Sequence, residues 1–395
     1  MPSNTSSASP DLRIAIIGGG LGGLTLARIL QTRGISSVVF ERELSVNSRP
    51  QGGTLDIHTE SGQAALKAAE LFEEFERFAR YEGQDLYILD KTGKAHIKEV
   101  TSDHVRDRPE IDRSTLREIL VNSLANGVVR WGSYVKSIRS EQKGKSPHII
   151  QLEDGSEETF DLVIGADGTW SRVRPLLSNA TPTYTGVSFV ECRLSDVEKQ
   201  HPDQVKLVGR GSMMALSDNK GLMAQRNGDG SIRVYVALRV AEDYLSHQDF
   251  STSSNARTFL LDIFPDWDES LKDLIHRCDN NHFTPRLLYS LPIEHHWETY
   301  PGVTLLGDAA HVMSPFAGEG ANLAMLDAAD LASEIVKMVK AKKDPKTCLQ
   351  DYEALMLERA SKAALESATN CDICISSDAP LGFVKLMKQY SSNNI

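Results

Sequence analysis

The stretch Leu12-Arg-Ile-Ala-Ile-Ile-Gly-Gly-Gly-Leu-Gly-Gly23 decides the fold. Residues 12–17 are almost wholly apolar, as expected of a short strand that is buried on both faces of a sheet. Residues 24–34 carry apolar side chains at helical spacing and end in a glycine, a typical helix stop. A second apolar run, residues 38–40, ends in Glu41. Strand, glycine turn, helix and strand in this order predict a βαβ unit.

The glycines of this unit predict a nucleotide site. Gly18, Gly20 and Gly23 fit the pattern G-x-G-x-x-G: the first allows a tight turn, the second lets a pyrophosphate approach, and the third packs helix on strand. The helix N-terminus adds free N–H groups and a positive dipole end. Glu41, at the end of the second strand, is placed to accept ribose hydroxyls. Because strand, helix and acid are in register, we expect a bound dinucleotide rather than a purely structural turn.

Two further turns follow buried strands. Asp167-Gly168 comes after the apolar run 162–164, and Gly307-Asp308 comes after the run 303–306. An aspartate at a strand end can hold a ribose or ribityl hydroxyl, and a helix N-terminus can stabilise negative charge on a bound ring. Each turn alone is equally compatible with a structural role. Three such strand ends together point to one cofactor.

The middle of the chain changes character. Residues 60–80 and 112–126 predict helices, whereas residues 184–239 form short alternating runs that predict a separate β-rich domain. The alternating face with Arg233, Tyr235 and Arg239 is either a solvated sheet face or the roof of a substrate cavity. Residues 321–336 predict a buried helix, and a long amphipathic helix is expected beyond Pro345.

Composition narrows the class of protein. The chain has 395 residues, more than one hydrophobic core usually fills, so we expect two domains. A net charge of -11 without a basic block argues against nucleic acid as a partner. There is no apolar stretch near the roughly 18 residues of a membrane span. The N-terminal residues are polar, without the apolar core of a leader peptide, and five cysteines argue for a reducing compartment. These features predict a cytoplasmic protein without a membrane span. Cys371 and Cys374 form a C-x-x-C pair, but a second pair that would complete a zinc site is missing, so we predict no metal.

In these motifs the sequence resembles the class A flavoprotein monooxygenases, the FAD-containing aromatic hydroxylases of the para-hydroxybenzoate hydroxylase type. The three motifs that carry the resemblance begin at Gly18, Asp167 and Gly307. Within that family the chain looks closest to the tetracycline-inactivating monooxygenases involved in antibiotic resistance. The similar stretches are Gly52–His58, Pro109–Arg117, Phe264–Asp268 and Pro315–Gly318.

The resemblance implies FAD and NADPH as cofactors, dioxygen as a reactant and a small aromatic or polyketide substrate. The positions that it assigns to cofactor binding are Gly18, Gly20, Gly23, Glu41, Arg42, Arg49, Asp56, Arg113, Asp167, Asp308, Pro315, Gly318, Gly320 and Asn322. Substrate contacts are expected from Met213, Gln225, Arg233, Tyr235 and Phe316. Glu319 departs from the family pattern, in which a Gln is common at this place. No side chain is assigned as an acid–base catalyst.

The expected fold is α/β, with a Rossmann-like FAD-binding domain, a β-sheet substrate domain and a C-terminal helix. The predicted boundaries are a tail at 1–10, the FAD-binding domain at 11–75, 95–176 and 280–340, the substrate domain at 76–94 and 177–279, and a C-terminal helical segment at 341–395. We expect a monomeric monooxygenase that inserts one oxygen atom into a phenol, enol or polyketide, tetracycline being one candidate. A flavin dehydrogenase or reductase that inserts no oxygen, and a non-catalytic FAD-binding protein, are the alternatives.

Overall fold

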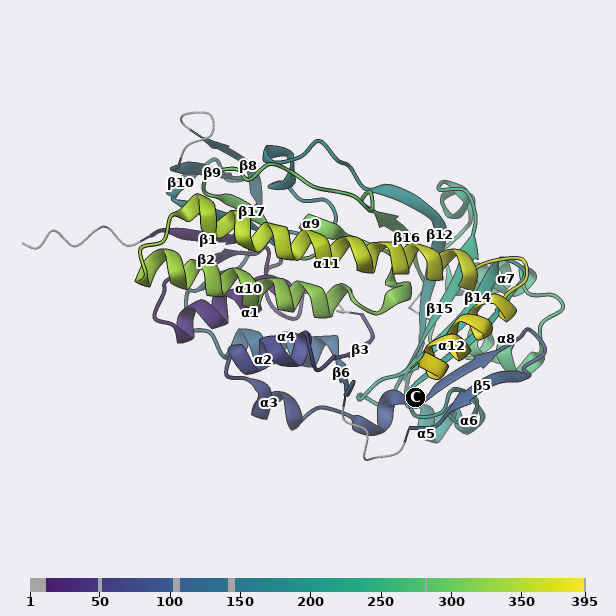
Figure 1. The fold of residues 1–395 in the computed structure, drawn as a ribbon. Coiled ribbons are helices and arrows are strands. Elements are labelled where there is room, and N and C mark those ends of the chain that lie inside the picture. Colours follow the sequence, from purple (N-terminus) through teal and green to yellow (C-terminus); the bar gives the residue numbers. More distant parts are fainter. Residues whose placement is uncertain (1–11, 49–51, 102–106, 141–145, 281–282, 394–395) are drawn as a thin grey trace, which may run out of the picture.

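The computed structural model describes residues 12–48, 52–101, 107–140, 146–280 and 283–393 (Figure 1). It has two lobes, one built on a parallel sheet and the other on a largely antiparallel sheet, and long C-terminal helices run along both. We call them the parallel-sheet lobe and the antiparallel-sheet lobe. The predicted α/β class is confirmed.

The parallel sheet is formed by strands that lie far apart in the sequence. Its order is β17 (Val303–Leu305), β11 (Leu162–Gly165), β1 (Ile14–Ile17), β2 (Val38–Phe40) and β7 (Val129–Arg130), and all neighbours run parallel. Helices α1 (Leu21–Thr32) and α10 (Gly320–Lys340) pack together beside it. A small antiparallel sheet of β10 (Glu157–Phe160), β9 (His148–Leu152) and β8 (Val135–Ser140) adds Phe160, whose ring meets that of Phe40 edge-on at 5.7 Å. Burial on both sides explains the continuous apolar runs of β1 and β11.

A second layer of this lobe carries a two-stranded ribbon, β3 (Thr54–Asp56) paired with β6 (Glu110–Asp112). Helix α4 (Arg113–Asn122) follows β6 directly. The single helix expected over residues 60–80 is in fact two, α2 (Gly62–Ala68) and α3 (Phe72–Glu76). They are separated at Glu70, whose φ of 58° lies in the left-handed region and ends the first helix.

The antiparallel-sheet lobe has the strand order β16 (Thr284–Ser290), β12 (Thr183–Leu194), β15 (Ile232–Arg239), β14 (Lys220–Arg226), β13 (Ser212–Ser217), β4 (Leu86–Leu89) and β5 (Ala95–Glu99). One face of this sheet forms a core with helices α5 to α8. Their bounds are α5 (Val197–Gln200), α6 (Pro202–Val208), α7 (Ser253–Asp262) and α8 (Glu269–His276).

Short 3-10 helices occur in both lobes, at η1 (Tyr81–Gln84), η2 (Arg174–Leu176), η3 (Tyr244–His247) and η4 (Pro315–Ala317).

Two predicted domain boundaries need correction. The predictions began pieces of the FAD-binding domain at residues 95 and 280, but β5 and β16 pair with β4 and β12 of the antiparallel sheet. Both strands lie at an edge of the sheet, β5 after a turn and β16 almost a hundred residues after β12. Sequence composition therefore did not indicate to which sheet they belong. The pieces of the parallel-sheet lobe therefore begin after Glu99 and Ser290.

The C-terminal helices connect the lobes. Helix α11 (Pro345–Cys374) begins beside α10 and ends against the antiparallel sheet, and α12 (Leu381–Asn393) lies across that sheet (Figure 1). On the parallel-sheet side the Tyr352 hydroxyl donates to the carbonyl of Leu305 at 2.8 Å. In the described ranges, no helix combines the length and apolar character that crossing a membrane requires.

Candidate active site

A cavity of about 370 Å³ lies where β1, β2 and β11 end. Ligands of open α/β sheets bind at this edge, because the strand ends and the following helix N-termini converge there. Seven of the predicted cofactor positions line the cavity, namely Gly18, Gly20, Glu41, Arg42, Arg113, Asp167 and Asp308. The three motifs, separated by more than 100 residues along the chain, therefore meet in one place.

The glycines of the first motif have the geometry that was expected of them. Gly18 has a φ of 110°, and a Cβ built on it would lie 2.2 Å from the carbonyl oxygen of Ala166. A Cβ on Gly23 would lie 2.2 Å from the carbonyl oxygen of Gly18. No described atom lies within 4 Å of a Cβ built on Gly20. Gly18 and Gly23 thus serve the turn and its packing, while Gly20 leaves space for a ligand.

Glu41 is buried beside this turn. Its Oε2 accepts a hydrogen bond from the N–H of Gly19 at 2.7 Å, and its Oε1 accepts one from Glu43 at 2.8 Å. Arg117, which the sequence analysis missed, donates to the carbonyl of Gly19 at 3.1 Å and to the Glu43 carboxylate at 2.7 Å. Arg117 lies one helical turn after the predicted Arg113, so helical spacing was the signal that could have identified it.

Asp167 ends β11 at the wall of the cavity. Its Oδ2 accepts from the N–H of Arg172 at 2.6 Å, whereas its buried Oδ1 meets no partner within the described ranges. Burial raises the pKa of Asp167, although hydrogen bonds from Ser171 and Arg172 oppose this effect. Arg174 donates to the carbonyls of Thr169 at 2.7 Å and Ala309 at 3.0 Å. The guanidinium of Arg174 thus joins the second and third motifs.

The third motif is stabilised by residues of α10 and α11 that do not line the cavity. Asp308 opens the short helix α9 (Asp308–His311) and is exposed at the cavity. His311 contacts the buried Asp327 of α10 at 2.6 Å, and Asp327 also accepts from the N–H of Gly307 at 3.0 Å. Arg359 of α11 donates to the other oxygen of Asp327 at 2.9 Å. Asp327 and Arg359 shape the turn without lining the cavity, and nothing in their local sequence indicated it.

The remaining predicted positions meet at the start of α10. The Asn322 amide donates to the carbonyl of Asp56 at 2.9 Å and accepts from the N–H of His58 at 2.9 Å. Gly318 has a φ of 70°, and a Cβ there would approach the Asp56 carboxylate to 3.6 Å. The carboxylates of Asp56 and Glu319 both contact the His58 ring. Pro315 and Gly320 flank this contact in η4 and at the first residue of α10.

The face of β15 that carries Arg233 and Tyr235 is covered. A Cβ on Gly53, in the loop before β3, would lie 2.8 Å from both the Gln225 amide oxygen and the Tyr235 hydroxyl. Arg233 is 7% exposed and forms an ion pair with Glu191. Of the two alternatives for this face, a solvated face is excluded at Arg233 and Tyr235, because the parallel-sheet lobe lies against them at Gly53.

Phe316 and Met213 differ in where the structure places them. The ring of Phe189 lies 6.0 Å from that of Phe316 and 5.7 Å from that of Tyr235, so Phe316 meets the same face. Met213 lies on the opposite face, in the core with α7 and α8. Its neighbour Met214 is on the Tyr235 side. The Met213 assignment is one residue out of register, and in a strand one residue reverses the face.

Two other predictions concern Arg49 and the Cys371–Cys374 pair. Arg49 lies outside the described residues. Cys371 and Cys374 are buried free thiols in α11, and burial raises the pKa of Cys371 to about 11. Over the ranges described, His, Cys, Asp and Glu side chains form no group suited to a metal ion.

Comparisons with known proteins agree with this geometry. A family model described as an FAD binding domain matches residues 11–367. The monooxygenase asqM of Emericella nidulans is 33% identical over 378 residues, covering 83% of this chain and 84% of that protein. Among solved structures, HpxO of Klebsiella pneumoniae in complex with FAD and uric acid has a TM-score of 0.79 at 19% identity, covering 96% of this chain and 93% of HpxO. A tetracycline destructase, Tet(55), has a TM-score of 0.74 at 19% identity, covering 98% and 96% of the two chains. At these identities the two structures compare the fold alone.

Proposed function

This chain belongs to the FAD-binding-domain family and is an FAD-dependent monooxygenase, and on that premise we propose that it uses NAD(P)H and dioxygen to oxygenate an electron-rich phenol, enol or polyketide. One observation carries the proposal: Arg233 and Tyr235 of the antiparallel sheet lie against Gly53, beside the segment that holds Asp56. A polar and aromatic surface thus borders the place that the family resemblance assigns to the flavin.

The residues of the cavity fit FAD. The unpartnered Oδ1 of Asp167 is suited to accept a hydrogen bond from a ligand hydroxyl, and the open space at Gly20 is suited to a pyrophosphate. Glu41 would hold the adenosine ribose, and Asp308 would hold the ribityl-phosphate region. When bound, FAD supplies the redox chemistry and the activation of dioxygen, which no side chain provides.

The proposed work of the sheet face is to orient the substrate. Arg233 Nε is buried and has no hydrogen-bond partner among the described residues, so it is suited to donate to a phenolic, enolic or carbonyl oxygen. Burial raises the pKa of Tyr235 to about 12, which keeps its hydroxyl protonated and able to donate. Phe189 and Phe316 offer aromatic surface to a ring. Such a set suits an oxygenated aromatic or enolic molecule.

The reductant would bind at the rim of the cavity. The chain has one dinucleotide βαβ unit, so a transient rather than a resident nicotinamide nucleotide is expected. Trp170 lies at this rim with 60% of its surface exposed, and its ring meets that of Tyr289 edge-on at 5.0 Å. Arg172 lines the same cavity and is exposed. An exposed indole beside a guanidinium suits a nucleotide with its base and phosphates.

The test is NADPH and NADH consumption by the purified yellow protein with tetracycline and a panel of phenolic polyketides. Products are analysed by mass spectrometry under ¹⁸O-labelled dioxygen. Stimulated consumption and a product that carries one labelled oxygen are expected. Consumption matched only by hydrogen peroxide for every compound, or no consumption with flavin still bound, would contradict oxygen insertion into this substrate class.

A matched pair of variants tests the sheet face. With an accepted substrate, Arg233→Gln should lower kcat/KM roughly 10- to 100-fold, since a hydrogen bond from a buried charged donor is lost. Arg286→Gln is the control, because Arg286 contacts the same Glu191 at 3.4 Å but is 53% exposed. Equal losses in the two variants would argue that Arg233 does not contact the substrate.

A further inference from the structure

His58 is held between two carboxylates at the junction of β3 and α10. Its Nε2 lies 2.8 Å from Oδ2 of Asp56, and its Nδ1 lies 3.3 Å from Oε1 of Glu319. The side chain of His58 is 9% exposed, so water does not replace these partners. A neutral imidazole has one N–H only, and a carboxylate accepts but does not donate. Carboxylates at both ring nitrogens are each suited to accept from an N–H, and this arrangement favours the doubly protonated, cationic ring.

The backbone around His58 is tied to the same place. Asn322 of α10 accepts from the N–H of His58 and donates to the carbonyl of Asp56. The segment from Pro315 to Asn322 is thus joined to β3 by neutral hydrogen bonds from the amide and by charged ones from the imidazolium. Gly318, in this segment, approaches the Asp56 carboxylate closely because it has no side chain.

Glu319 adds a second negative charge beside the His58 ring, after that of Asp56. A Gln at this position, common in the family, would accept the same hydrogen bond without the charge. Burial alone would lower the pKa of His58, but the hydrogen bonds and charges of Asp56 and Glu319 outweigh burial and raise it to about 9. The carboxylate of Glu319, which is 28% exposed, is paired with the buried ring of His58.

We propose that His58 is a positioning residue of the cofactor site, a charged pin that fixes the Pro315–Asn322 segment against β3, and that Glu319 keeps the pin charged. The proposal rests on the assignment of Asp56 and of this segment to the flavin end of the site. It adds a pH-dependent element to cofactor binding. Below the pKa of His58 the ring is charged and can donate to both carboxylates. Above it, a neutral ring faces two carboxylates and can donate to one of them only, so one of the two ring contacts that join β3 to the segment is lost.

Other ionisable groups lie near His58. The charged groups that face His58 are Asp56 on β3 and Glu319 at the start of α10, and Asn322 is neutral. Glu110 on β6 lies opposite Asp56 in the ribbon. Burial, and then the charge of Asp56, raise the pKa of Glu110 to about 8, so Glu110 titrates in a neighbouring range. Its contribution must be separated from that of His58.

The experiment follows the His58 ring by NMR in the FAD-loaded protein with ¹³C- and ¹⁵N-labelled histidine, assigned by the absence of its signal in His58→Gln. In parallel, the dissociation constant of FAD is measured from pH 6 to 10.5. In the wild type we expect His58 to titrate near pH 9 and FAD affinity to fall several-fold over the same interval. In Glu319→Gln both midpoints should move down together by roughly one to two pH units, because one adjacent charge is lost. At pH 6 its FAD affinity should stay within about twofold of the wild type, since the pin is then charged in both proteins.

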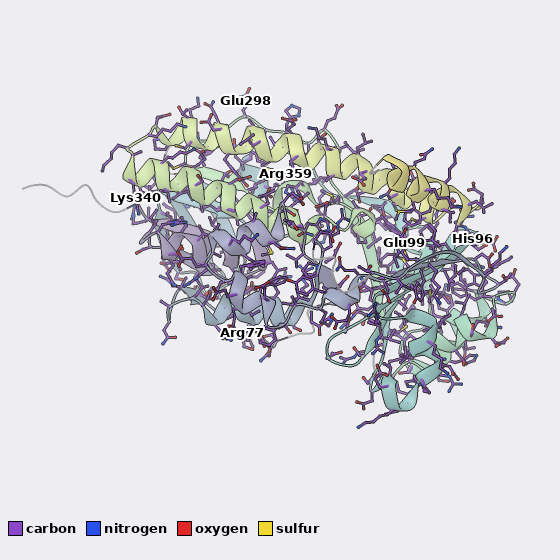
Figure 2. The ribbon with its side chains drawn as sticks, turned by 60° about the horizontal axis from the view of Figure 1, so that its bottom comes forward. Arg77, His96, Glu99, Glu298, Lys340 and Arg359 are labelled. Atoms are coloured by element: carbon purple, nitrogen blue, oxygen red, sulfur yellow. The ribbon has the colours of Figure 1, made fainter. Side chains whose placement is uncertain are left out.

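Two controls make the outcome decisive. His96→Gln removes a histidine that contacts Asp90 at the same 2.8 Å, at the outer end of the antiparallel sheet (Figure 2), and should change neither curve. Glu110→Gln should leave the midpoint near pH 9 in place. The proposal is overturned if His58 titrates near its ordinary value of about 6.5, if FAD affinity does not follow the His58 titration, or if Glu110→Gln abolishes the transition. None of these readouts needs NADPH or a substrate, so they remain decisive even if oxygen insertion fails.

Discussion

At the scale of single residues, Gly18 and Gly20 stand two positions apart but serve different ends. Gly18 adopts a φ that side chains rarely tolerate, and its missing Cβ makes room for the backbone of β11. Gly20 has an ordinary φ of -77° and faces open space. The fold therefore requires the first glycine, and we propose that the second is required by the ligand.

Alanine at each position separates these roles. Gly18→Ala should lower the free energy of unfolding of the FAD-free protein by about 2–4 kcal/mol, since strain and a backbone clash add. Gly20→Ala should stay within about 0.5 kcal/mol of the wild type but weaken FAD binding, because its methyl group occupies the space of the pyrophosphate. Urea unfolding and FAD titration measure the two effects. If Gly20→Ala bound FAD normally, the cofactor would not approach this turn.

At the scale of elements, α10 and α11 are joined by a buried charge network. Burial alone would raise the pKa of Asp327, but His311 and Arg359 outweigh it and lower it. A carboxyl with a lowered pKa stabilises the folded state above its unfolded pKa, and this stabilisation is lost as pH falls through the folded value. Asp327 therefore contributes at neutral pH and ceases to do so in acid.

Arg359→Met tests this coupling. It removes the guanidinium beside Asp327, and we expect a loss of up to about 3 kcal/mol, less than for a fully buried pair because Arg359 is partly exposed. Acid unfolding should begin at a higher pH than in the wild type, since the pKa of Asp327 is then less depressed. Arg77→Met is the control: its pair with Glu74 is exposed, and its loss should cost less than about 1 kcal/mol (Figure 2). Similar urea midpoints for the two variants would contradict the network.

At the scale of the whole molecule, α11 spans both lobes. Its 30 residues correspond to a rod of about 45 Å. Its first half packs on the parallel-sheet lobe through Tyr352, and its end is bound by Arg239 of β15, which donates to the carbonyls of Ile375 at 2.6 Å and Cys371 at 3.2 Å. The lobes are thus connected by a continuous helix as well as by their interface.

Replacing Arg239 should loosen one end of this connection. In Arg239→Ala the carbonyls of Cys371 and Ile375, at the end of α11, lose their donor. We therefore expect faster hydrogen exchange over residues 371–389 and unchanged exchange over residues 345–360. Arg193→Ala removes an arginine of equal exposure (31% against 30%) from the same sheet, paired with Asp229 and not with α11, and should leave both segments unchanged. Uniformly faster exchange along α11 in Arg239→Ala would mean that the helix opens as a single unit, so that this contact does not act on one end alone.

Much of the molecule could be predicted from local sequence, and what could not has a common cause. The three glycine and aspartate motifs were predictable because each is a strand end with its own turn chemistry. The pairs His58–Glu319 and Asp327–Arg359 were not, since their members are brought together by tertiary packing. Met213 shows a different limit: alternation identified the strand, but the choice between its two faces depended on which lobe covers each. Edge strands such as β5 and β16 were assigned to the wrong piece because pairing, and not composition, defines their sheet.

All five cysteines of this chain are buried. Burial raises the pKa of Cys348, Cys371 and Cys374, and that of Cys192 is raised by its contact with Cys278 and by burial, whereas the same contact lowers the pKa of Cys278. Thiols are oxidised as thiolates and need access to the oxidant. An enzyme that activates dioxygen releases hydrogen peroxide whenever a turnover miscarries. The interior placement of these thiols limits the access of an oxidant, including hydrogen peroxide from the dioxygen chemistry that we propose.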